Sequence, residues 1–106
     1  MTTDPDPRYA RRAGGAPTAM RYIVRGRVQG VGFRWWCLRV ADVLGVRGSV
    51  RNRADGTVEI RAAADPSTLT AFEGRLRSGP SLARVDEIEA TPSAEPVAGD
   101  GFVIAS

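Results

Sequence analysis

The sequence predicts an α+β fold in which two helices pack on one face of an antiparallel sheet. Several short segments alternate apolar and polar residues, which is typical of strands with one buried face. Two other segments carry apolar residues at helical spacing. Along the chain these segments follow the order strand, helix, strand, strand, helix, strand, with a short strand at the end. This βαββαβ order predicts a ferredoxin-like sandwich.

The first strand and the first helix are joined by a glycine-rich turn. An alternating run at residues 22–28 predicts the strand. The helix is expected at residues 33–44, where apolar side chains recur at i, i+3, i+4 and i+7. Gly45 suits the left-handed conformation that is common just past a helix C-terminus. Cys37 lies on the apolar face of this helix, and we expect it to be a small core residue.

The remaining elements are separated by typical turn and cap residues. Asp55 lies in a tight turn at residues 54–56, which predicts a hairpin between the two strands beside it. Asp65 and Pro66 suit the N-cap and first position of a second helix, which ends near Gly79. The remaining strands are expected at residues 46–53, 57–63, 84–91 and 102–104.

Composition sets limits on the architecture and on the chemistry. The first 19 of the 106 residues contain almost no apolar side chains, so we predict a disordered tail at 1–19 and one domain at 20–106. The chain has no histidine and a single cysteine, and all 15 of its basic residues are arginine. The usual general base, the commonest metal ligand and a Schiff-base lysine are therefore absent. We expect neither a metal nor another cofactor.

Partners and location follow from charge and hydropathy. The formal net charge of +3 and the pI near 10.0 suit an anionic ligand. No secretory signal or long apolar segment occurs, so we expect a cytoplasmic protein that does not contact a membrane. The sequence leaves the oligomeric state open, and a monomer is the simplest expectation.

The turn between the first strand and the first helix has the residues of an anion site. Gly30 and Gly32 permit backbone conformations that bring N–H groups close to a ligand. The free N–H groups at a helix start favour a negative charge. Arg34 adds a planar fork of donors that matches two phosphate or carboxylate oxygens. Taken alone, the same residues also suit a simple tight turn with a solvated arginine.

The segment Val28-Gln29-Gly30-Val31-Gly32-Phe33-Arg34 resembles the signature of the acylphosphatase family. The likeness covers about residues 20–92 and, more weakly, 101–104. It continues through Ala41, Leu44-Gly45, Gly48, Val50-Arg51-Asn52, Asp55-Gly56-Thr57-Val58, Phe72, Gly79-Pro80 and Ala83-Arg84-Val85. Such an ordered series is far more specific than one glycine motif. The resemblance also implies a ferredoxin-like fold, which agrees with the order of the predicted elements.

The resemblance implies an enzyme that hydrolyses acyl phosphates to a carboxylate and inorganic phosphate. It implies that Arg34 binds the substrate phosphate and that Asn52 orients the attacking water. Asn52 also suits a plain turn residue beside the predicted hairpin turn. The implied phosphate-binding residues are Gln29, Gly30, Val31, Gly32, Phe33 and Arg34.

So few residues are sufficient for this reaction. The leaving carboxylate is a weak base and needs no proton from a general acid. Phosphoryl transfer depends mainly on positioning and on stabilisation of charge. Asn52 is too weak a base to take a proton from water, so the substrate phosphate itself is the expected acceptor. The sequence therefore predicts hydrolysis without a metal.

Two parts of the chain depart from the family pattern, and two alternative functions stay open. Ser49 and the C-terminal residues 104–106 depart from the family pattern and bear on the level of activity. A catalytically weak domain that handles carbamoyl phosphate or regulates another protein is one alternative. The other is a nucleic-acid-binding module, although its sheet face would lack the paired aromatic residues on which bases stack. The arginines expected on the sheet face opposite the helices are Arg25, Arg27, Arg47, Arg51 and Arg61.

Overall fold

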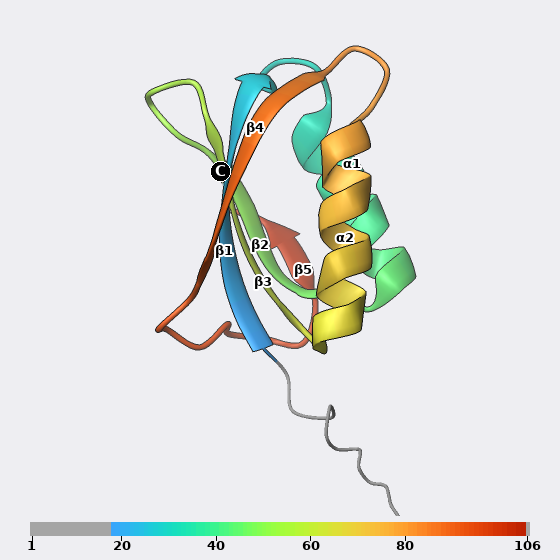
Figure 1. Ribbon diagram of the computed structural model, residues 1–106, viewed down its shortest axis with the longest axis vertical. Helices are drawn as coiled ribbons and strands as arrows, with labels where there is room; N and C mark the ends of the chain where they lie inside the picture. The colour runs from blue at the N-terminus through green and yellow to red at the C-terminus, as the bar shows by residue number, and fades with distance from the viewer. Residues whose placement is uncertain (1–17, 106) are drawn as a thin grey trace, which may run out of the picture.

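Two helices cover one face of a five-stranded sheet in the computed structural model, which describes residues 18–105 (Figure 1). This arrangement confirms the predicted α+β sandwich. The elements are β1 (Thr18–Arg27), α1 (Phe33–Leu44), β2 (Arg47–Asn52), β3 (Val58–Ala64), α2 (Pro66–Ser78), β4 (Arg84–Pro92) and β5 (Phe102–Ile104).

The first strand begins earlier than the sequence indicates. β1 already includes Thr18 and Ala19, which pair with Ala64 and Ala63 of β3. These two residues belong to the segment assigned to the tail. Backbone pairing requires no apolar side chain, so hydropathy did not reveal this part of the strand. The rest of the predicted tail, residues 1–17, lies outside the described residues.

The sheet has the strand order β4-β1-β3-β2-β5. β1 lies between β3 and β4 and is antiparallel to both, and β2 is antiparallel to β3. β5 instead runs parallel to β2, with Gly48 opposite Phe102 and Val50 opposite Ile104. The expectation of an antiparallel sheet thus holds for β1, β2, β3 and β4. It is wrong for β5, which is the edge strand beside β2 and runs parallel to it.

The core lies between the sheet and the two helices. Val58, Ile60 and Ala62 of β3 are buried on the helix-facing side, as their alternation predicts. The Phe72 ring of α2 lies with its centroid 6.1 Å from that of Tyr22 and also 6.1 Å from that of Phe102, in edge-to-face geometry. These contacts join α2 to both a central and an edge strand.

Cys37 is fully buried on the inner face of α1, which confirms its role as a small core residue. Burial raises the pKa of its thiol well above the ordinary value. The thiolate is the nucleophilic form of cysteine, so burial and the raised pKa both disfavour a reactive role for this side chain.

Candidate active site

The glycine-rich loop connects the end of β1 to the start of α1. Gly30 and Gly32 have φ angles of 73° and 83°, which residues with a Cβ rarely adopt. A Cβ added at either position would meet no atom within 4 Å. The glycines are therefore required by backbone conformation rather than by space. Left-handed residues in such turns direct N–H groups into a concavity that suits an anion.

The two helices begin in different ways. At α2, the Asp65 carboxylate accepts a hydrogen bond from the Thr68 N–H at 3.0 Å, and bonds from Ser67 and Thr68 lower the pKa of Asp65 to about 2. At α1, the N-cap residue is Gly32, which provides no side-chain cap, and the first turn contains no acidic residue. The positive end of the α1 dipole is therefore left available for a ligand anion.

Arg34 lies in the first turn of α1, two residues after the cap. Its side chain is half-buried. The arginine is thus on the same short segment as the loop N–H groups, because no other element separates them. The backbone N–H groups of the loop and the start of α1 therefore lie next to the residue that the sequence predicts to bind phosphate.

Asn52 is the last residue of β2 and pairs with Val58 of β3. Its side-chain oxygen Oδ1 is buried and accepts no hydrogen bond from any group within residues 18–105. Buried polar atoms nearly always have a partner, from the protein or from ordered water. This oxygen therefore has an unused capacity to accept a hydrogen bond from a small bound molecule such as water.

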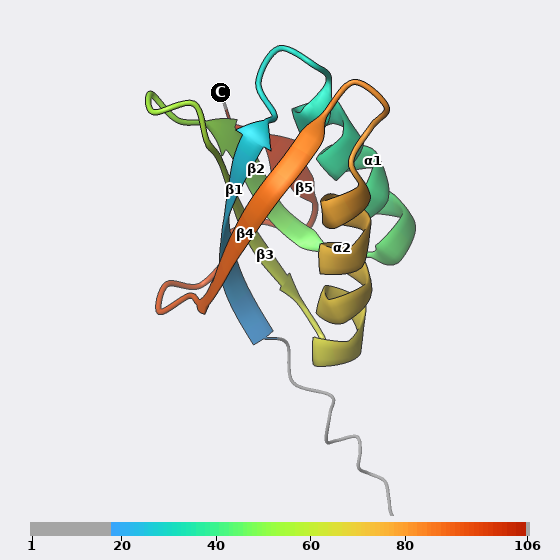
Figure 2. The same ribbon diagram turned by 45° about the horizontal axis from the view of Figure 1, so that its top comes forward.

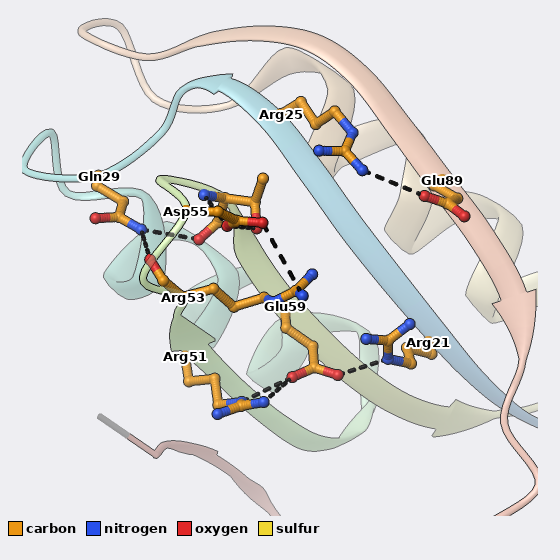
Figure 3. Close-up of polar contacts among 9 residues, drawn as sticks. Arg21, Arg25, Gln29, Arg51, Arg53, Asp55, Glu59 and Glu89 are labelled. Carbon is orange, nitrogen blue, oxygen red and sulfur yellow. Dashed lines mark hydrogen bonds and ion pairs between the residues drawn. The ribbon is translucent and has the colours of Figure 1, made fainter.

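Gln29 joins the loop to the hairpin that follows Asn52. Its side-chain Nε2 donates hydrogen bonds to the Arg53 and Thr57 carbonyl oxygens, each at 2.8 Å (Figure 3). The loop after β1 and the β2–β3 hairpin also lie at the same end of the sheet in both ribbon views (Figure 2). The sequence singled out the backbone of Gln29 but not this function of its side chain.

Asp55 organises the turn of the same hairpin, as predicted. Its Oδ1 accepts hydrogen bonds from the Thr57 N–H at 3.0 Å and from the Thr57 hydroxyl at 2.6 Å. These bonds hold the pKa of Asp55 below its usual value. The Thr57 carbonyl also accepts a bond from the Arg53 N–H at 2.9 Å, so the turn closes on itself.

A buried carboxylate changes the character of the sheet face opposite the helices. Glu59 of β3 is only 3% exposed and lies between Arg21 Nε at 2.6 Å and Arg51 Nε at 2.7 Å (Figure 3). Burial alone would raise the pKa of Glu59, but the bonds from the two arginines outweigh it and lower the pKa. Glu59 is not among the site residues that the sequence predicts. Strand alternation, which places Glu59 on the same face as the arginines, was the available signal.

Other arginines of this face also lie close to carboxylate or backbone carbonyl oxygens. Arg25 lies 3.6 Å from both Glu87 and Glu89. Arg61 lies 2.8 Å from Glu95 Oε1. Arg47 Nη1 donates to two backbone carbonyls of the segment that precedes β5. The face is thus a mixture of opposite charges, which is a poor surface for a nucleic-acid backbone.

Two further properties concern metals and membranes. Within residues 18–105, no three side chains of histidine, cysteine, aspartate or glutamate come together as a set of metal ligands. Neither α1 nor α2 has the length and apolar character needed to cross a lipid bilayer.

The fold and the site together define a ferredoxin-like α+β domain with a glycine-rich loop at its first strand-to-helix turn. The acylphosphatase family model matches residues 20–104. The chain therefore belongs to the acylphosphatase family. An acylphosphatase of Nitrobacter winogradskyi is 53% identical over 72 residues, covering 68% of this chain and 73% of the relative.

Solved structures give the same result. The crystal structure of acylphosphatase from Bacillus subtilis superposes with a TM-score of 0.80 at 36% identity, covering 86% of this chain and all of that chain. The crystal structure of HypF from T. kodakarensis superposes with a TM-score of 0.75 at 33% identity. That match covers 84% of this chain but only 12% of HypF, so the fold also occurs as a small part of a longer protein.

Proposed function

We propose that this chain hydrolyses acyl phosphates to a carboxylate and inorganic phosphate, with Arg34 and Asn52 as its catalytic residues. The observation that carries the proposal is the joining of the two segments that bear them. Gln29 attaches the loop that leads to Arg34 to the hairpin that begins at Asn52. The proposed mechanism assigns no role to a residue of a second copy, and we keep the monomer as the simplest proposal. The cytoplasmic location stays a prediction.

The loop and the start of α1 bind the phosphoryl group in this mechanism. The N–H groups of residues 29–33 donate to the phosphoryl oxygens, and the Arg34 guanidinium contacts two of them. Charge shifts over these oxygens as the reaction proceeds, so fixed donors lower the barrier without having to reorganise. The absence of an acidic residue in the first turn of α1 keeps this environment positive.

Asn52 orients the attacking water. Its buried Oδ1 accepts one proton of the water in a hydrogen bond and directs the water oxygen toward phosphorus. The new P–O bond forms as the bond between phosphorus and the acyl oxygen breaks, and the carboxylate leaves with that electron pair. The proton lost by the water goes to a phosphate oxygen. No general base from the protein is needed.

A direct assay tests the proposal. Purified protein should release phosphate from benzoyl phosphate in the presence of a metal chelator, because every proposed contact comes from the chain itself. The measurement is phosphate release over time, corrected for spontaneous hydrolysis. Activity that disappears with chelator and returns with a divalent cation would contradict the mechanism. An intact phosphate site without turnover would favour the regulatory alternative.

Inorganic phosphate should stabilise the folded protein, because product and substrate share the oxygens that the loop binds. At 100 times its Kd, a ligand adds about 2.7 kcal/mol to the free energy of unfolding. A thermal unfolding series in phosphate is therefore expected to show a rising Tm, with shifts of the amide signals of residues 29–34. Sodium chloride of equal ionic strength is the control. Equal melting curves in both salts would argue against an anion site at the loop.

A further inference from the structure

We propose that the Gln29 side chain is a positioning residue that fixes Asn52 relative to the bound phosphoryl group. The inference rests on the proposed function and concerns the same site. Gln29 precedes the first glycine of the loop, and its amide reaches across to the hairpin after β2. Its side chain thus links the proposed phosphate-binding segment to the segment that is proposed to orient water.

The location of the contacts shows what the link controls. The loop N–H groups and Arg34 belong to one continuous segment, so they keep their mutual geometry if that segment shifts. Asn52 belongs to β2, and its neighbour Arg53 supplies one of the two carbonyl oxygens that Gln29 binds. A change at Gln29 therefore alters the distance between water and phosphorus more than it alters the binding of phosphate.

Hydrogen bonds within the hairpin turn connect the Gln29 contacts to the end of β2. The Thr57 carbonyl accepts from both the Arg53 N–H, at 2.9 Å, and Gln29 Nε2, at 2.8 Å. Asp55 holds Thr57 through two further hydrogen bonds. The turn is therefore a hydrogen-bonded unit, and both N–H groups of the Gln29 amide donate to it. Attachment of the loop to this unit sets the position of the strand end that carries Asn52.

Gln29→Met tests the inference, because methionine has similar length but no donor. We expect kcat for benzoyl phosphate to fall about 10- to 100-fold, as when the contacts that orient a metal ligand are lost. The Kd for inorganic phosphate should change by less than about threefold, since the binding segment itself is intact. If this variant does not fold, Gln29→Asn, one methylene shorter, serves for the same comparison.

A double-mutant cycle separates positioning from general weakening. In the Asn52→Ala background, Gln29→Met should lower kcat by less than about threefold, because the residue that it positions is absent. If Gln29→Met lowers kcat in that background by the same factor as in the original protein, the inference is wrong. An unchanged kcat in the single variant, or a loss confined to phosphate affinity, would also overturn it. If Asn52→Ala alone leaves kcat unchanged, the proposed role of Asn52 fails first, and the inference fails with it.

Arg47→Met is the matched control. Arg47 likewise donates to two backbone carbonyls, those of Val97 and Gly99, and likewise joins two segments of the chain. It lies at the other end of β2, five residues and about 16 Å along the strand from Asn52. We expect its loss to lower the Tm and to leave kcat and the Kd for phosphate unchanged. An equal fall in kcat in both variants would overturn the positioning role of Gln29.

Discussion

Replacement of Arg34 by alanine is expected to abolish phosphate binding and turnover together. In the proposed mechanism the guanidinium contacts phosphoryl oxygens both in the bound substrate and in the transition state, so the variant loses both contacts. Two charge-assisted hydrogen bonds contribute at least about 3 kcal/mol, which corresponds to a loss of roughly 100-fold or more in phosphate affinity. Arginines that stabilise phosphoryl transfer contribute about 10³-fold or more to turnover. Phosphate titration and steady-state kinetics measure the two losses.

Two control variants make the Arg34 result specific. Arg34→Lys should recover little activity, because an ammonium group is a point charge and does not form the planar contact with two oxygens. Arg39→Ala removes the same charge from an exposed position on the same helix, and it should leave both measurements near their original values. If Arg34→Ala retains normal phosphate affinity, the loop does not bind phosphate in the proposed manner.

Replacement of Asn52 by alanine is expected to lower turnover while phosphate still binds. The proposed partner of its Oδ1 is the attacking water, not the phosphate, so the loss belongs to kcat. Removal of one preorganised polar contact to a reacting group costs about 10²- to 10³-fold. Single-turnover and steady-state measurements with benzoyl phosphate determine this change, and the phosphate-dependent rise in Tm reports on binding.

The Asn52 variant has to remain folded for this comparison. Its Oδ1 accepts no hydrogen bond from the described part of the chain, so alanine removes no protein hydrogen bond of that oxygen. Circular dichroism of the variant should match that of the original protein. If Asn52→Ala abolishes phosphate binding while Arg34→Ala does not, the two roles are reversed. If neither substitution slows hydrolysis, the catalytic assignment is wrong.

Local features of the chain predicted most of the fold. The bounds of α1 followed from glycines at both ends and from its apolar spacing, and β3 showed its buried face by alternation. β5 was recognised, but its parallel direction was not. Three residues that pair through their backbones carry no mark of direction in their side chains. Pairing partners depend on the whole sheet, which local patterns do not describe.

The sequence predicted the residues of the candidate site but not the contacts between them. The loop glycines, Arg34 and Asn52 stood out as residue types in a recognisable order, and their catalytic roles stay predictions. The contacts of Gln29 are with backbone carbonyls, which every residue has, so no sequence pattern identified them. The ion pairs of Glu59 were not predicted because its arginine partners are 38 and 8 residues away along the chain.

The paired charges on the open face of the sheet bear on how fast an anion reaches the loop. Arg21 and Arg51 share Glu59, and Arg25 lies beside two glutamates, so opposite charges alternate over short distances. The attraction of such pairs for a distant ion largely cancels, and physiological salt screens what is left within about 8 Å. An approaching acyl phosphate is therefore not retained in unproductive encounters over the sheet. Under the proposed function, the uncapped start of α1 is then the favoured place for the anion, because no cap side chain or first-turn acid competes with it there.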